Sequence, residues 1–130
     1  MVQQQIGDLD RQARDNLSLH DLINLRFGVR TRDSDTRAPA NLTTTAAQIV
    51  PNDSSRVGLI IVNLGSTNIF YRWGNAPTSA SGIFLAANGG KDAWSYFDDF
   101  HIIGKELFGI AASGTPEIYV METLIEPPGS

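Results

Sequence analysis

Short runs of β-branched and aromatic residues recur along most of this chain, and they constrain its fold more than any other feature. Turn-forming residues separate the runs at intervals of about 8–12 residues, a spacing that is typical of sandwiches, jelly rolls and barrels. The sequence therefore predicts a mainly β fold, a β-sandwich or jelly-roll domain of seven or eight short antiparallel strands. The expected strands span residues 42–49, 56–63, 67–73, 82–86, 93–97, 100–103, 106–112 and 117–124.

One link between two expected strands carries a clear turn signal. The tripeptide Leu64-Gly65-Ser66 joins the two strongest runs, 56–63 and 67–73. Short glycine-containing links between two β runs are typical of β-hairpins. We therefore expect these two strands to be neighbours in one sheet.

Residues 1–41 differ in composition from the rest, because they hold six Arg and six Asp and few aromatic residues. Apolar residues at helical spacing predict one interrupted helix or two helical turns over about 5–26. Residues 30–37 contain no apolar side chain and are expected to form an extended arm. The chain is thus predicted to comprise a helix and arm at 1–41, a β-sandwich domain at 42–126 and a tail at 127–130.

An amphipathic helix of this length is not stable alone, so its apolar side must pack on the main domain or on another subunit. We expect its apolar residues to make the contacts of the arm with a partner: Ile6, Leu9, Leu17, Leu22, Ile23 and Leu25.

Two of the expected strands are apolar on both faces. In the run 56–63, Ile60 and Val62 lie on the face opposite Leu59 and Ile61. In the run 106–112, Phe108 and Ile110 lie on the face opposite Leu107 and Ala111. A strand of a sandwich ordinarily has one solvent-exposed, polar face. Since both faces of these strands are apolar, another part of the protein or a partner must cover the outer face. The sequence leaves two covers open, the N-terminal helix or a neighbouring subunit, and the candidates for an oligomer interface are Ile60, Val62, Phe108 and Ile110.

Charge and composition exclude several classes of protein. Fourteen acidic and ten basic residues give a net charge of −4, which argues against nucleic acid and anionic membranes as partners. The absence of cysteine excludes disulfides and thiol catalysis. No apolar run approaches the roughly 18 residues of a membrane span. The first residues lack the features of a signal peptide, so secretion by that route is not expected.

The sequence indicates no catalytic, cofactor or metal site. The chain has two histidines, His20 and His101. Asp98, Asp99 and His101 are close in sequence and could bind a cation, but a solvated turn is the favoured interpretation. Paired carboxylates among Glu106, Glu117 and Glu122 are interpreted instead as outward-facing strand residues. We therefore expect a protein that is not an enzyme.

A longer pattern links the two strongest runs, Arg56-x-x-Leu59-Ile-Ile-Val-Asn63-x-Gly65-Ser-Thr-Asn68-Ile-Phe-Tyr71-x-Trp-Gly74, and it precedes Gly82-Ile-Phe-Leu85 and the turn Asn88-Gly89-Gly90. With this pattern, the chain resembles small virion structural proteins of tailed bacteriophages. A late strand then ends in Val120-Met121-Glu122, so the resemblance covers about residues 56–123. The N-terminal segment has no counterpart in it.

The resemblance implies a β module of a phage particle, assembled in the host cytoplasm. The function expected from it is capsid decoration, in which the protein cements the head by binding between capsid subunits. The expected partners are the major capsid protein or other virion proteins, and further copies of the chain, with a trimer favoured.

Three other functions stay open at this stage. The first is a collar, tail or head-fibre component of the same particle. The second is a carbohydrate-binding module that would stack sugars on Trp73, Trp94 and Tyr96. The third is an enzyme on a jelly-roll scaffold, centred on His101 with Asp98 or Asp99.

Overall fold

The computed structural model describes residues 28, 30–35 and 40–126. The helix expected over about 5–26, its contact residues from Ile6 to Leu25, and the tail at 127–130 lie outside this part of the chain. The chain divides into two compact units, Asp33–Leu124 and a smaller one formed by Met1–Arg32 with Ile125–Ser130. In the smaller unit, the Glu126 N–H donates to the carbonyl oxygen of Arg30 at 2.8 Å.

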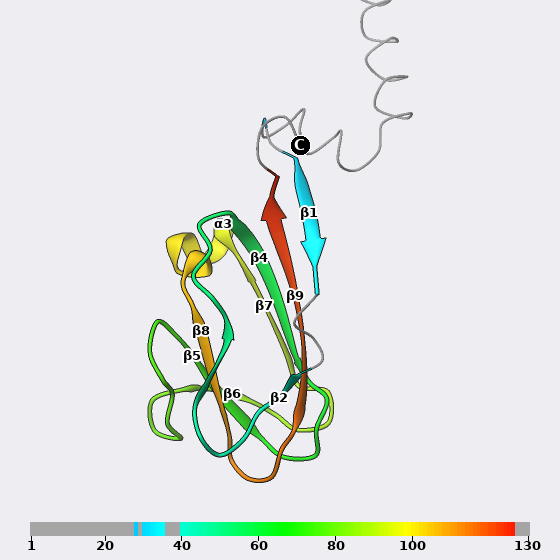
Figure 1. Ribbon diagram of the computed structural model, residues 1–130, viewed down its shortest axis with the longest axis vertical. Helices are drawn as coiled ribbons and strands as arrows, with labels where there is room; N and C mark the ends of the chain where they lie inside the picture. Colours follow the sequence, from blue (N-terminus) through cyan, green and yellow to red (C-terminus); the bar gives the residue numbers. More distant parts are fainter. Residues whose placement is uncertain (1–27, 29, 36–39, 127–130) are drawn as a thin grey trace, which may run out of the picture. The chain divides into compact units, whose positions relative to one another are not determined.

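The structure confirms the mainly β prediction: the strands form two antiparallel sheets (Figure 1). The first sheet has the order β1-β9-β4-β7, with β2 also pairing with β9. Its strands are β1 (Thr31–Ser34), β2 (Ala40–Asn41), β4 (Arg56–Asn63), β7 (Lys91–Ser95) and β9 (Glu117–Ile125). The second sheet has the order β3-β8-β5-β6 and comprises β3 (Ala47–Val50), β5 (Ile69–Trp73), β6 (Ile83–Leu85) and β8 (Leu107–Ala111).

A shared apolar core holds the two sheets together. Alternate residues of the central strands are buried, as β5 shows with Ile69, Tyr71 and Trp73 inside and Arg72 exposed. From the first sheet, Leu59 and Ile61 join the same buried cluster. The period-two pattern of the sequence therefore places one face of every central strand in a common interior.

The expected hairpin between β4 and β5 is wrong, because the two strands belong to different sheets. Asn63 is buried at the end of β4, where the chain crosses from the first sheet to the second. Its side-chain amide donates to the carbonyl oxygens of Thr67 at 2.8 Å and Leu85 at 3.3 Å. The N–H of Gly65 donates back to Asn63 Oδ1 at 3.0 Å. These bonds satisfy polar groups at the corner that a β-hairpin would have satisfied by pairing the two strands.

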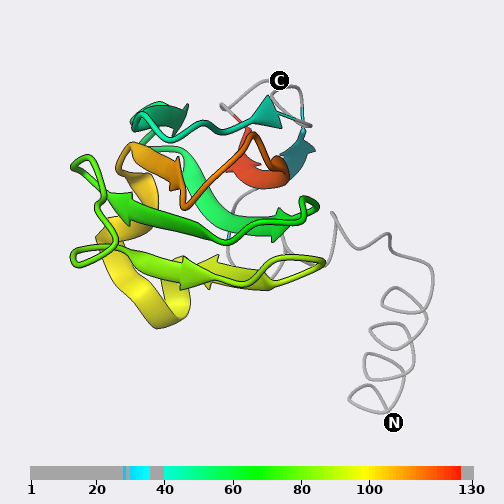
Figure 2. The same ribbon diagram turned by 90° about the horizontal axis from the view of Figure 1, so that it is seen from below.

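The strand expected at 100–103 is also wrong, because the chain is helical there. A short helix α3 (Tyr96–Asp99) runs into a 3-10 helix η1 (Phe100–Gly104), and the two form the yellow coil at the margin of the domain (Figure 1 and Figure 2). The Ser95 side chain accepts from the Asp98 N–H and caps α3. Among the described residues, no helix has the length and apolar character needed to cross a membrane.

A buried arginine fixes the end of the domain next to these helices. Arg56 donates from Nε to the Glu122 carboxylate at 2.8 Å and pairs with it again through Nη2 at 2.7 Å. Its remaining donors reach three backbone carbonyl oxygens, those of Pro51, Ile103 and Lys105. Glu122 is therefore buried, which corrects the expectation that it faces solvent.

The segment expected to be an arm contributes two strands. Both β1 and β2 pair with β9, and the Thr123 hydroxyl donates to the Asp33 carboxylate at 3.1 Å. Residues 31–34 lack apolar side chains, but an edge strand needs only backbone partners and a few polar contacts to be held.

Candidate interaction surfaces

The outer face of the second sheet carries a group of large apolar side chains. The register places Phe84, Phe70 and Ile110 in one row, since Phe70 lies opposite both of the others. Phe108 lies in the next row, opposite Arg72. Phe84 is 53% exposed, and its ring centroid lies 5.7 Å from that of Phe70. We call Phe70, Phe84, Phe108 and Ile110 the phenylalanine patch.

The outer face of the first sheet is apolar along β4. Ile60 lies opposite Met121 on one side and Ala93 on the other, and Val62 follows in the next outward row, opposite Tyr119. Ile60 is 37% exposed. Polar groups border this face, because the Tyr119 hydroxyl donates to the Asp35 carboxylate.

The four residues predicted as interface candidates therefore do not form one surface. Ile60 and Val62 lie on the outer face of the first sheet, whereas Phe108 and Ile110 lie on the outer face of the second. The two faces point in opposite directions because both sheets turn their inner faces toward the shared core.

Exposed aromatic side chains also gather on the two short helices. Tyr96 and Phe97 on α3 are about half exposed or more, with ring centroids 4.8 Å apart. Phe100 at the start of η1 is 72% exposed and has a φ of 56°. A bulky residue seldom adopts this left-handed conformation, so the bend between the helices holds an aromatic ring in solvent at some cost in backbone energy.

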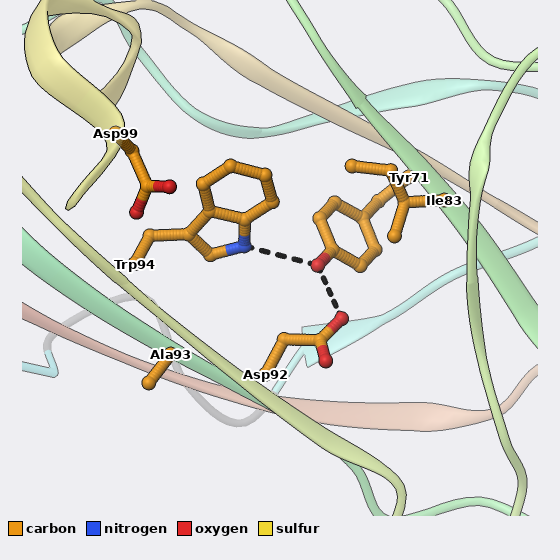
Figure 3. Close-up of a pocket in the computed structure, with 6 residues that line it drawn as sticks. All are labelled: Tyr71, Ile83, Asp92, Ala93, Trp94 and Asp99. Carbon is orange, nitrogen blue, oxygen red and sulfur yellow. Dashed lines mark hydrogen bonds between the residues drawn. The ribbon is translucent and has the colours of Figure 1, made fainter.

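A pocket of about 260 Å³ lies beside these helices, between the edge strands β6 and β7 (Figure 3). Its lining comes from β5, β6, β7 and α3: Tyr71, Ile83, Asp92, Ala93, Trp94 and Asp99. The Trp94 indole donates to the Tyr71 hydroxyl at 3.0 Å, and that hydroxyl donates to the Asp92 carboxylate. The chain of bonds fixes three side chains from two sheets in one orientation.

The electrostatics of the pocket keep Tyr71 protonated. Burial, the hydrogen bond to Asp92, and the negative charges of Asp92 and Asp99 raise the pKa of the Tyr71 hydroxyl well above its usual value. The Trp94 hydrogen bond acts in the opposite direction and is outweighed. The hydroxyl is therefore a hydrogen-bond donor that orients Asp92, and it is poorly suited to act as a base near neutral pH.

The aromatic residues expected to form a sugar platform do not lie on one surface. Trp73 is 7% exposed, and its ring meets Trp94 edge-on with centroids 5.6 Å apart inside the domain. Tyr96 is exposed on α3. A stacking platform needs coplanar exposed rings, so this set does not provide one.

The acidic residues near His101 serve the local fold. The Asp99 carboxylate accepts from the Ser95 N–H at 3.0 Å, and the Asp98 carboxylate accepts from the Ser95 hydroxyl at 3.2 Å. Within the described part of the chain, no group of three or more His, Asp or Glu side chains is placed to hold a metal ion.

The sequence does not indicate several residues of these surfaces. Phe70 and Phe84 carry no distinguishing signal, because a strand rich in aromatic residues does not reveal which of its faces is covered. The sequence holds a weak signal for the pocket in β7, where Asp92 and Trp94 alternate with Lys91 and Ala93. In the structure, Asp92 and Trp94 are more buried than Lys91 and Ala93.

No protein-family model matches this chain, and a search of curated proteins finds no match. The residues behind the resemblance to phage virion proteins have roles in folding: Arg56 in the buried ion pair, and Asn63 and Gly65 in the corner after β4. The motif is thus accounted for by the architecture, and the function has to be argued from the surfaces.

Proposed function

We propose that this chain is a non-enzymatic structural protein of a tailed-phage particle, and that it decorates the capsid by binding between capsid subunits. The phenylalanine patch carries the proposal. Isolated apolar residues are ordinary on a protein surface, but a contiguous apolar group marks a site of contact with another protein. The patch would bury its four side chains against the capsid and so stabilise the shell by mass action.

The strand order supports the structural part of the proposal. The sheets β2-β9-β4-β7 and β3-β8-β5-β6 have the strand order of an eight-stranded jelly roll, with β1 as an added edge strand. Jelly rolls are frequent in viral capsid proteins and also in lectins and cupins. The fold alone does not choose among these, so the choice rests on the patch.

The N-terminal segment is the second part of the proposed attachment. We propose that Ile6, Leu9, Leu17, Leu22, Ile23 and Leu25 contact the capsid or a neighbouring subunit. Deleting residues 1–28 leaves β1 in place, so the truncated protein tests this contact separately from the patch. Attachment of the truncated protein at full strength would remove the segment from the proposal.

The patch is tested by binding to empty capsid shells. Phe84→Ser is expected to weaken attachment on the order of tenfold, because burying a phenylalanine at an interface contributes at least that much. Leu64→Ser is the matched control, since Leu64 is 51% exposed but lies in the corner after β4, outside the patch. Equal attachment of the two variants would contradict the proposal.

The copy number in purified particles tests the position in the particle. A decoration protein is expected in as many copies as the capsid has subunit junctions. A copy number that matches a single ring would assign the protein to the collar or the tail, and absence from the particle would overturn the virion function altogether.

A further inference from the structure

The pocket between β6 and β7 is acidic and has an aromatic wall. Asp92 and Asp99 reach it from β7 and α3, and the Trp94 indole lies between them in the view of Figure 3. The described residues that line it include no Lys, Arg or His. Within the described part of the chain, neither carboxylate forms an ion pair, and each has a hydrogen-bond donor on one oxygen, from Tyr71 and Ser95.

This combination of groups is complementary to an alkyl cation. An ammonium or guanidinium group is attracted both by carboxylates and by the face of an indole ring, most strongly where water is partly excluded. Ile83 supplies an apolar wall on the opposite strand, against which the methylene groups of a long basic side chain can lie.

We propose that this pocket receives a lysine or arginine side chain of the protein on which the domain docks. The inference rests on the proposed docking function and adds the chemistry of the partner: an apolar surface from which one basic side chain projects.

The size of the pocket favours a single side chain over a larger ligand. Its volume of about 260 Å³ lies below the roughly 300–1,000 Å³ of sites that enclose drug-sized molecules. The charge excludes anionic ligands, since a phosphate or carboxylate would meet two like charges there.

The exposed aromatic residues of the adjacent helices extend the same surface. Asp99 belongs both to the pocket and to α3, so Tyr96 and Phe97 lie within a few residues of the pocket wall. With Phe100 they supply the apolar contact area that a lone charged side chain lacks, and aromatic residues of this kind commonly anchor interfaces.

The pocket is tested on the full-length protein by NMR, with Nα-acetyl-lysine methylamide as the probe. The indole N–H signal of Trp94 is expected to shift saturably during the titration, because the pocket is lined by that ring. Trp73 gives the comparison signal: its indole packs against Trp94 but is buried and does not line the pocket, so its signal is expected to shift less. The variant Trp73→Phe assigns the two signals.

The matching probe without the charge is Nα-acetyl-norleucine methylamide. Its binding is expected to be about tenfold weaker, since the ion pairing and cation–π contributions are both lost. The lysine probe is also expected to bind more weakly in high salt, because the pocket is open to solvent. Equal shifts from both probes, or no shift from either, would overturn the proposal.

A pair of adjacent variants locates the charge. Asp99→Asn is expected to weaken binding of the lysine probe roughly threefold to fivefold. Asp98→Asn removes the same charge from the same helix but lies outside the pocket, and it is expected to leave binding unchanged. Equal effects of the two would indicate general attraction to an acidic surface and would contradict the pocket.

The titration is independent of attachment to capsid shells. Binding of the lysine probe without attachment of the protein would retain the pocket and reject the capsid as the partner. Attachment that is unaffected by Asp99→Asn, with no shift of Trp94, would retain the docking function and reject the pocket.

Discussion

At the scale of single residues, the strongest constraint on the fold is the buried pair of Arg56 and Glu122. Arg56 bonds to one carboxylate and to three carbonyl oxygens, one at Pro51 and two at Ile103 and Lys105, around the end of η1. A buried ion pair is not by itself favourable, because both charges lose their hydration. Its value lies in specificity, since no other side chain could satisfy all four acceptors at once.

Removing one partner of this pair is therefore expected to be costly. Arg56→Met should lower the free energy of unfolding by about 3–5 kcal/mol, because it leaves the Glu122 carboxylate buried without its cation. Arg72→Ala is the control, since Arg72 is exposed on β5 and its loss should cost less than about 0.5 kcal/mol. Urea unfolding measures both, and similar midpoints for the two variants would contradict this role of Arg56.

Tyr71 is expected to make the free energy of unfolding depend on pH in the alkaline range. Its pKa is raised in the folded protein, so above about pH 10 the unfolded chain releases a proton that the folded one keeps. The free energy of unfolding should then fall as the pH rises beyond that point. Urea midpoints from pH 8 to 11 are expected to decrease less steeply for Tyr71→Phe. An unchanged slope would show that other groups cause the loss.

At the scale of elements, the corner after β4 depends on a close approach of two backbones. A Cβ atom added to Gly65 would lie 2.3 Å from Pro116 Cβ and 2.5 Å from Pro116 Cα. The chain cannot yield easily there, because the Leu64 N–H donates to the carbonyl oxygen of neighbouring Glu117 at 2.8 Å.

Gly65→Ala is therefore expected to destabilise the protein by about 1–3 kcal/mol, as overpacking of a rigid contact does. Gly58→Ala on β4 is the control, since its Cβ would come no closer than 3.4 Å to Thr123. Thermal unfolding compares them. A melting temperature for Gly65→Ala equal to that of Gly58→Ala would mean that the corner adapts.

The same corner shows where prediction from sequence reaches its limit. The run 56–63 matches β4 residue for residue, because hydrophobic alternation is a local property. The choice between a hairpin and a crossing depends on the side-chain amide of Asn63, which bonds to Leu85 twenty-two residues away. Likewise, the apolar residues at 100–103 suit a strand, but this segment continues from α3, which Ser95 caps, and Arg56 binds the Ile103 carbonyl oxygen at its end.

The candidate surfaces divide in the same way. The sequence indicated that Ile60 and Phe108 need a cover, since both strands are apolar on each side. It did not indicate that they face opposite directions, because strand order is set by long-range pairing. The pocket was missed altogether, since Tyr71, Asp92 and Asp99 come from three elements that only the packing brings together.

At the scale of the whole molecule, two apolar faces point in opposite directions, so packing one face around a threefold axis would leave the other face exposed. We propose that the first-sheet face joins the subunits and that the phenylalanine patch remains for the capsid. Light scattering is then expected to show a trimer. Ile60→Asp should give a monomer, whereas Phe84→Ser should stay trimeric. A monomeric parent protein would contradict this division.

The place of β9 in the first sheet also governs when the chain can fold during synthesis. Of the strands in the described residues, β9 is synthesised last, yet it lies between β4 and the edge formed by β1 and β2. A nascent chain that has not yet released residues 117–125 from the ribosome cannot close this sheet, and β4 meanwhile exposes a bare hydrogen-bonding edge beside Ile60. Folding of this sheet therefore waits until β9 has left the ribosome, and until then the chain exposes surface that chaperones commonly bind.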